Sequence, residues 1–200
     1  MTRVFIARHG QTDWNVEGRL QGSSNTALND TGRQQALGAA KTLGPAVRDG
    51  VLVVTSPLDR AHETARIIAA QWGSEVHTDE RFVERDYGPW EGLSADEREK
   101  YDPLQHKAYR NGLEPEYEGY ENHASVGARM VAGILDWVER APGDLLVVTH
   151  GSASRMAIMH LLELPVSGRR IGNLGNASWS RLGLPEGGGW SLDCHNIGAE

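Results

Sequence analysis

Two histidines in this chain each lie between an apolar run and a glycine. His9 lies in VFIARHG at residues 4–10, and His150 lies in LLVVTHG at residues 145–151. A neutral imidazole can act as a nucleophile or a general base, and a glycine beside it lets the backbone come close to a bound group. One such His-Gly pair is most often an ordinary turn. Two of them, each after an apolar run, indicate a shared reactive site.

Two arginines accompany these histidines. Arg8 directly precedes His9, and Arg60 lies in SPLDR at residues 56–60, shortly after another apolar run. A guanidinium group can donate two parallel hydrogen bonds to phosphate oxygens, and the amino end of a helix, where we expect Arg60, also favours anions. SPLDR by itself is equally compatible with a plain capped helix start, and His62 could line the pocket or lie on an exposed helix face. Together with the two His-Gly pairs, the arginines predict an oxyanion pocket.

Three apolar runs must bring these side chains together. They are VFIA at 4–7, VLVV at 51–54 and LLVV at 145–148. Continuous runs rich in β-branched residues are typical of strands that are buried on both faces of a parallel sheet. Ligands of such sheets bind beyond the carboxyl ends of the strands, which is where the arginines and histidines follow.

Helical patterns separate the apolar runs. TGRQ at 31–34 fits a capping box, and the helix that it opens should stop near residues 44–45. Ser56 and Pro57 supply an N-cap and a first-position proline for the next helix. Further elements are expected as helices over about 122–140 and from 151 to before 165, and as strands over 177–184 and 190–194.

Alternating strands and helices predict an α/β protein. We expect a three-layer α/β/α sandwich with a mostly parallel central sheet and an antiparallel edge. A length of 200 residues fits one domain over 1–200, since domains average roughly 150 residues. The charged stretch at about 93–121, with its scattered tyrosines, breaks the apolar pattern, and we interpret it as a lid-like surface insertion.

Composition argues against several kinds of partner. The net charge of −7 gives no basic face for nucleic acid or anionic lipid, and no run approaches the ~20 apolar residues of a membrane span. The single cysteine, Cys194, fits a reducing compartment, and no signal-peptide pattern is present, so we expect a cytoplasmic protein. The remaining histidines lack metal-ligand spacing, and we expect neither a metal nor another cofactor.

Four motifs of the chain resemble the signatures of a known family. RHGQTDWN at 8–15, SPLDRAHETA at 56–65, ERDYGPWEG at 84–92 and VVTHG at 147–151 follow the order of the histidine phosphatase superfamily, which includes cofactor-dependent phosphoglycerate mutases. The resemblance spans nearly the whole chain and implies the phosphoglycerate mutase-like fold. GYEN at 119–122 departs from the family's usual Gly-Gly-Glu-Ser, which puts a substrate contact there in doubt.

The resemblance also implies roles for individual residues. His9 attacks phosphorus and forms a phosphohistidine that water hydrolyses, and flanking arginines suit this role because they disfavour the protonated imidazole. Arg8, Arg60 and His150 hold the phosphoryl oxygens. Glu84, which without the resemblance is an ordinary surface glutamate, gives a proton to the leaving alkoxide, and a nearby phosphate dianion favours its acid form. The substrate-side candidates are Asn15, Gln21, Gly22, Ser23 and Gly151.

Three activities are compatible with this resemblance. Mutases of the family usually carry a longer insertion and a longer tail, so the short chain favours a metal-independent phosphomonoesterase of the histidine acid phosphatase type that hydrolyses a small phosphorylated metabolite. A phosphoglycerate mutase is the alternative. A catalytically idle phospho-ligand binding protein is least favoured, because His9, Glu84 and both arginines are present.

The end of the chain carries a narrower resemblance. GNLGNASWSRL at 172–182 and LDCHNIGAE at 192–200 are similar to actinobacterial glucosyl-3-phosphoglycerate phosphatases, which remove phosphate from a glucosylated glycerate. A sugar phosphate or another phosphoglycerate derivative would suit the same catalytic core. The sequence is also compatible with a homodimer through an exposed edge strand.

Overall fold

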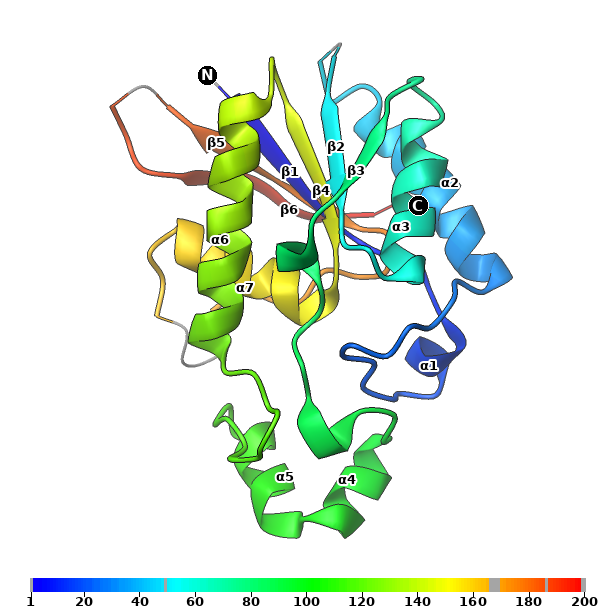
Figure 1. Ribbon diagram of the computed structural model, residues 1–200, viewed down its shortest axis with the longest axis vertical. Coiled ribbons are helices and arrows are strands. Elements are labelled where there is room, and N and C mark those ends of the chain that lie inside the picture. Colours follow the sequence, from blue (N-terminus) through cyan, green and yellow to red (C-terminus); the bar gives the residue numbers. More distant parts are fainter. Residues whose placement is uncertain (1, 49, 166–169, 186, 199–200) are drawn as a thin grey trace.

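A six-stranded sheet forms the centre of the molecule (Figure 1). The computed structural model describes residues 2–48, 50–165, 170–185 and 187–198. The strand order is β3-β2-β4-β1-β5-β6. The strands are β1 (Thr2–Arg8), β2 (Leu52–Thr55), β3 (Val76–Thr78), β4 (Leu145–Thr149), β5 (Trp179–Leu184) and β6 (Ser191–Ile197).

Strand pairing confirms the predicted mostly parallel sheet with an antiparallel edge. β3, β2, β4 and β1 pair in parallel, whereas β5 is antiparallel to both β1 and β6. Arg8 lies opposite Thr149, and Thr55 lies opposite Val148, so the carboxyl ends of β1, β2 and β4 lie side by side. The short strand β3 was not predicted, and β6 extends to Ile197, beyond its predicted end at residue 194.

Helices cover both faces of the sheet, which confirms the three-layer arrangement. Val4 and Ile6 of β1 belong to one core cluster with α6 and α7, whereas Phe5 and Ala7 belong to a second cluster with α2 and α3. Successive side chains of a strand point to opposite faces, so a continuous apolar run supplies both clusters. These helices are α2 (Asp30–Leu43), α3 (Asp59–Ala69), α6 (His123–Arg140) and α7 (Gly151–Leu161).

Helix α2 begins before the predicted capping box. Its N-cap is Asn29, whose side-chain oxygen accepts a hydrogen bond from Gly32 N at 2.9 Å. Asparagine is a stronger N-cap than threonine, and Thr31 therefore lies inside the first turn. The predicted end of the helix agrees with the structure, since the C-cap is Gly44.

Helix α3 begins two residues later than predicted. The Oγ of Ser56 lies 2.8 Å from Nε2 of His150 and accepts from the backbone N–H of Leu58, the N-cap residue, at 3.3 Å. Pro57 and Leu58 precede the first helical residue, Asp59. The backbone N–H of Asp59 donates to Oδ1 of Asn25 at 2.8 Å, so the first-turn acceptor comes from another loop.

The insertion packs around a buried tryptophan. α4 (Ala95–Tyr101) and α5 (Pro103–Arg110) lie beyond one end of the sheet in Figure 1. Trp90 is fully buried, and the rings of His106, Tyr109, Tyr117 and Tyr120 surround it at centroid distances from 5.3 Å to 6.4 Å. Tyrosines that are scattered in the sequence therefore form one small aromatic core. Movement of this insertion as a lid stays a prediction.

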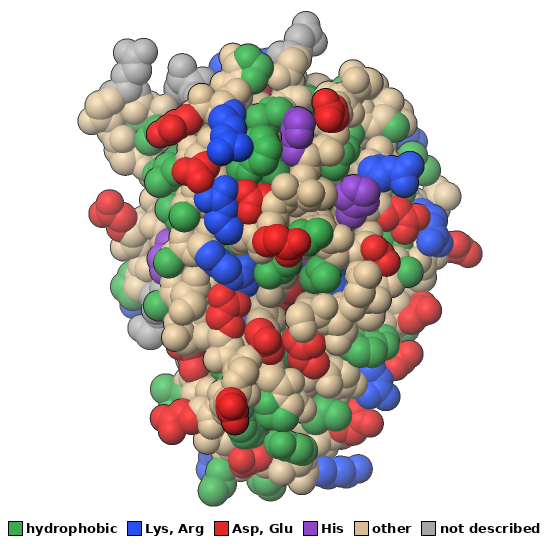
Figure 2. All heavy atoms as spheres, viewed as in Figure 1, with side chains coloured by type: hydrophobic (Ala, Val, Ile, Leu, Met, Phe, Trp, Pro, Cys, Tyr) green, Lys and Arg blue, Asp and Glu red, His purple; other side chains and the backbone are tan. Residues whose placement is uncertain are grey.

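Short elements complete the described chain. They are α1 (Asp13–Val16), η1 (Glu80–Phe82) and η2 (Gly88–Trp90). Figure 2 shows acidic and basic side chains interspersed over the face that is seen in Figure 1. In the described part of the chain, every helix is too short or too polar to cross a lipid bilayer. β3 and β6 are the edges of the sheet, and a homodimer through one of them stays a prediction.

Candidate active site

A pocket of about 160 Å³ opens at the carboxyl ends of β1 and β4. Several segments that are distant in the sequence build it, because the strand ends and the first turns of α3 and α7 meet there. It is lined by Arg8, His9, Asn15, Arg19, Leu20, Gln21, Arg60, Glu84, Tyr87, Tyr109, Gly151, Ser152 and Asn173. Seven of the ten predicted site residues are in this set, and His150, Gly22 and Ser23 are not.

The imidazole of His9 is buried and oriented by the backbone. Its Nδ1 lies 2.7 Å from the carbonyl oxygen of Gly10. A carbonyl oxygen can only accept a hydrogen bond, so Nδ1 carries the proton of the neutral ring and Nε2 keeps its lone pair. Burial, together with the charges of Arg8 and Arg60, holds the pKa of His9 well below its ordinary value. At neutral pH the ring therefore presents an unprotonated nitrogen.

Arg8 presents an unsatisfied donor to the pocket. Its Nη1 donates to the carbonyl oxygen of Leu174 at 2.8 Å, while its buried Nε has no hydrogen-bond partner in the described part of the chain. Burial lowers the pKa of Arg8. A buried donor without a partner is unusual and indicates a place for an acceptor that is not part of the protein.

Arg60 is fully buried and connects two parts of the site. Its Nη1 donates to Ser24 O at 2.6 Å and, at 3.4 Å, to Oγ1 of Thr26, and its Nη2 donates to Gly22 O at 2.8 Å. Its Nε donates to Nδ1 of His150 at 3.2 Å. Burial lowers the pKa of Arg60 to about 10, which leaves it charged at neutral pH. Four of its five N–H groups have these partners, and one on Nη2 remains for a ligand.

His150 lies beside the pocket, behind Arg60. Because its Nδ1 accepts from Arg60, its Nε2 carries the proton and donates to Oγ of Ser56 at 2.8 Å. The ring is fully buried, and its centroid lies 5.2 Å from that of His9. Burial and the charge of Arg60 hold the pKa of His150 well below its ordinary value. In this structure His150 contacts Arg60, and the predicted contact of His150 with a phosphoryl oxygen stays a prediction.

The carboxylate of Glu84 is held at the amino end of α7. Its Oε2 accepts from Ser152 N at 3.0 Å, and its Oε1 accepts from Ala153 N at 2.9 Å and from Arg85 N at 2.8 Å. These backbone donors fix both oxygens beside the pocket that Glu84 also lines. Glu84 is therefore a buried pocket residue, and the alternative of an ordinary surface glutamate is wrong.

The side-chain oxygen of Asn15 contacts the protein, and its N–H groups lie on the side of the pocket. Its Oδ1 accepts from Thr12 N at 3.1 Å, from Thr12 Oγ1 at 3.2 Å and from Nδ2 of Asn176 at 3.0 Å. A backbone N–H can only donate, so the contact with Thr12 N assigns the oxygen of the amide. The two N–H groups of Asn15 are consequently available on the side that lines the pocket.

The side chain of Glu91 holds the loop at residues 21–24 in place. Its Oε1 accepts from Ser23 N at 2.8 Å, and its Oε2 accepts from Oγ of Ser23 and of Ser24, each at 3.1 Å. Gly22 has a positive φ of 52°, and a side chain there would collide with Glu91. Gln21 lines the pocket, whereas Gly22 and Ser23 contact Arg60 and Glu91 instead. Glu91 lies in ERDYGPWEG, but no role was predicted for it.

Further pocket residues were missed in the sequence. Arg19 lies in the loop after His9, and Ser152 follows Gly151, so their positions beside known motifs could have indicated them. The Oγ of Ser152 is buried without a hydrogen-bond partner in the described residues. Tyr109 comes from the insertion, for which no sequence pattern predicted a contact. The others are Leu20, Tyr87 and Asn173.

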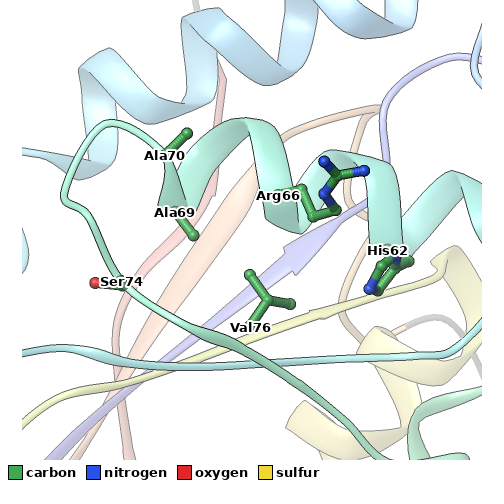
Figure 3. A pocket seen from close by; sticks show the side chains of 6 residues that line it. All are labelled: His62, Arg66, Ala69, Ala70, Ser74 and Val76. Atoms are coloured by element: carbon green, nitrogen blue, oxygen red, sulfur yellow. The ribbon is translucent and has the colours of Figure 1, made fainter.

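His62 does not belong to this pocket. It lines a separate hollow of about 440 Å³ between α3 and β3, together with Arg66 and Val76 (Figure 3). The side chains of His62 and Arg66 extend from successive turns of α3. The alternative of a helix-surface histidine is thus the one that the structure supports.

Comparison with known proteins identifies the family. The family model described as "Histidine phosphatase superfamily (branch 1)" matches residues 4–198. The chain belongs to this superfamily. It is a hydrolase of the phosphatase class, and its mixed sheet with an antiparallel edge is the phosphoglycerate mutase-like arrangement of this histidine phosphatase family.

Named relatives of this histidine phosphatase include enzymes of phosphoglycerate derivatives. Glucosyl-3-phosphoglycerate phosphatase of Mycobacterium tuberculosis is 34% identical over 215 residues, which cover 99% of this chain and 96% of the relative. The structure of mycobacterial glucosyl-3-phosphoglycerate phosphatase in complex with VO3 is similar with a TM-score of 0.88 and 35% identity, over 97% of this chain and 98% of that one. Phosphoserine phosphatase from Entamoeba histolytica, in complex with 3-phosphoglyceric acid, has a TM-score of 0.83 and 28% identity, over 98% of both chains.

Proposed function

We propose that this histidine phosphatase is a metal-independent phosphomonoesterase that works through a phosphohistidine on His9. The observation that carries the proposal is the fixed orientation of His9, whose Nδ1 is bound to Gly10 O while its Nε2 is unprotonated beside Arg8. A neutral imidazole nitrogen in a pocket that Arg8 and Arg60 also line is suited to attack on phosphorus.

In the first step, the lone pair of His9 Nε2 forms a bond to phosphorus as the bond from phosphorus to the ester oxygen breaks. Glu84, in its protonated form, gives its proton to the departing oxygen, so the leaving group departs as an alcohol. In the second step, water attacks phosphorus, the Glu84 carboxylate accepts a proton from that water, and the N–P bond breaks. Inorganic phosphate and neutral His9 are the products.

The phosphoryl group needs donors for its equatorial oxygens, because negative charge is spread over them during transfer. Arg8 supplies its unpaired Nε, and Arg60 supplies one Nη2 N–H. Asn15 contributes its amide N–H groups, and Gly151 lines the pocket at the start of α7. His150 keeps the guanidinium of Arg60 in place through its Nδ1.

The finer substrate proposal is a phosphorylated sugar or glycerate derivative, with glucosyl-3-phosphoglycerate as the first compound to try. Two phenols, Tyr87 and Tyr109, line the pocket together with Arg19, which is also ion-paired with Glu17 and Glu97. Such a wall suits a leaving group with hydroxyl and carboxylate groups. The relatives that act on or bind phosphoglycerate derivatives support the same choice.

Phosphate release in the presence of EDTA tests this function directly. The panel contains glucosyl-3-phosphoglycerate, 3-phosphoglycerate, phosphoserine, glycerol 3-phosphate and p-nitrophenyl phosphate, and isomerised phosphoglycerate is measured in parallel. We expect metal-independent release that one carboxylate-containing ester dominates. Isomerisation with little free phosphate would assign the pocket to a mutase, and the lack of any turnover or phosphoenzyme would indicate an idle binding protein.

The variant His9→Ala serves as the negative control of this assay. Contaminating phosphatases would release phosphate from both preparations equally. Equal activity across all five compounds would contradict the finer substrate proposal and leave the phosphatase assignment in place.

A further inference from the structure

The loop that leads into β5 contacts the nucleophile segment repeatedly. Arg8 N donates to Ser178 O at 3.0 Å, and Ala177 N donates to His9 O at 3.0 Å. Arg8 Nη1 donates to Leu174 O at 2.8 Å. This loop belongs to GNLGNASWSRL at 172–182, which resembles a group of phosphatases but for which no chemical role was predicted.

The side-chain amide of Asn176 lies at the centre of these contacts. Its Nδ2 donates to His9 O at 3.2 Å and to Oδ1 of Asn15 at 3.0 Å. His9 O is an acceptor only, so the nitrogen of the amide must face it. An amide nitrogen has two N–H groups, and these two bonds use both of them.

Asn176 therefore holds two groups of the active site in place. Together with Thr12, it holds the oxygen of Asn15, so that the N–H groups of Asn15 lie on the side that lines the pocket. It also holds the carbonyl of the residue whose imidazole attacks phosphorus. We propose that Asn176 is a positioning residue for phosphoryl transfer, which acts through Asn15 and the backbone of His9. This inference rests on the function proposed above.

Aspartate could not replace Asn176 in this role. Its carboxylate would face His9 O and Asn15 Oδ1, which are both acceptors, and Asn15 Oδ1 would keep only its contacts with Thr12. The added charge would also lie on the nucleophile side of a pocket built for an anion.

A matched control exists in the same region. Oδ1 of Asn196 accepts from Gly175 N at 2.8 Å and so holds the same loop from β6. Asn196 is exposed, has a positive φ of 58°, and acts only as an acceptor in this contact. Asn196→Asp keeps the acceptor, tolerates the backbone conformation and adds the same charge as Asn176→Asp.

The test compares Asn176→Ala, Asn176→Asp and Asn196→Asp with the unmodified protein. The measured quantities are kcat, KM, the inhibition constant of inorganic vanadate, and the Tm. We expect Asn176→Ala to lower kcat and vanadate affinity by about 100-fold, as small misplacements in active sites do, with a smaller change in KM. Asn176→Asp should lose more, and Asn196→Asp should stay within about twofold of the unmodified enzyme, since it keeps the contact.

A double-mutant cycle with Asn15→Ala separates positioning from general loosening of the loop. If Asn176 acts through Asn15, the double variant should lose clearly less vanadate affinity than the product of the two single losses. Independent losses, or an Asn176→Ala enzyme with unchanged kcat and vanadate affinity, would overturn the inference. If the alanine variant does not fold, Asn176→Ser takes its place with the same expectations.

The proposed function and this inference fail differently in these experiments. An unmodified protein that neither releases phosphate nor binds vanadate would contradict the proposed function and, with it, the role of Asn176. An active unmodified enzyme whose Asn176 variants match it contradicts the role of Asn176 alone.

Discussion

The backbones of Gly10 and Gly32 are in direct contact, with no space for a side chain between them. A Cβ atom on Gly10 would lie 2.3 Å from Gly32 O, and a Cβ atom on Gly32 would lie 2.1 Å from Gln11 O. The segment that follows His9 therefore rests on the first turn of α2. Distances this short cannot be relieved by a side-chain rotation, because both neighbours are backbone atoms.

Gly32→Ala should destabilise the protein and reduce turnover together. Replacement of a helical glycine by alanine ordinarily stabilises a helix by up to ~1 kcal/mol, so the sign of the effect is diagnostic. We expect a loss of about 1–3 kcal/mol in the free energy of unfolding in urea, because the helix and the His9 loop must separate. Gly189→Ala is the control, since a Cβ atom there meets no atom within 4 Å. Equal stability of the two variants would contradict the contact.

The phosphoryl group of the intermediate should reside on Nε2 of His9. Gly10 O occupies the Nδ1 side of the ring at 2.7 Å, so only Nε2 faces the pocket with a lone pair. NMR of the trapped phosphoenzyme, with ¹⁵N-labelled histidine and detection of ³¹P, distinguishes the two nitrogens. His9→Ala should form no phosphoenzyme, and phosphorus bound to Nδ1 would show that the ring rotates before it attacks.

Glu84→Gln should affect substrates according to their leaving groups. Alkyl phosphates need a proton on the departing oxygen, and we expect about 10²–10⁴-fold slower turnover for them. The p-nitrophenolate ion leaves without a proton, so its ester should lose far less. Glu139→Gln, on the exposed surface of α6, is the matched control. Equal losses on both kinds of ester would remove Glu84 as the general acid.

His123 should make the protein less stable in mild acid. Its Nε2 lies 2.8 Å from Nη1 of Arg85, and burial, with the charges of Arg85 and Arg155, lowers the pKa of His123 to about 3. The unfolded chain binds a proton near pH 6.5 and the folded protein does not, so stability falls as the pH drops below 6.5. At pH 5.5 this linkage amounts to at most about 1.4 kcal/mol.

The variant His123→Gln tests this linkage. Glutamine can still accept from Arg85 and donate to Glu114, whose Oε1 lies 3.2 Å from Nδ1 of His123, but it cannot bind a proton. Urea unfolding at pH 8 and at pH 5.5 should show a smaller acid-induced loss for the variant than for the unmodified protein. Identical losses would mean that His123 takes up its proton in the folded state.

Local sequence patterns were sufficient for every strand except β3 and for the residues at the strand ends. The runs at 4–7 and 145–148 are continuous because alternate residues, such as Phe5 and Ile6, serve two different core clusters. Arg8, His9 and Gly151 are next to those strands in the chain, so a correct strand prediction also located them. In the structure β1 and β4 pair in parallel with Arg8 opposite Thr149, which brings the two strand ends together.

Helix boundaries were predicted less well, because a cap depends on what else its side chain contacts. Ser56 has the right type and position for an N-cap, but its hydroxyl contacts His150, which is distant in the sequence. Asn25 takes over as the acceptor for the first turn of α3. A local pattern cannot distinguish a free hydroxyl from one that has a tertiary partner.

The sequence by itself determined the family, the α/β layers and the reactive groups at the strand ends, because each depends on residues that are neighbours in the chain. Tertiary structure alone decided how Glu84 meets the amino end of α7, how Tyr109 reaches the pocket from the insertion, and how Asn176 holds Asn15. These contacts join segments that have no periodic pattern of their own. Their geometry follows from the packing of the whole sheet and its helices, which no short stretch of sequence contains.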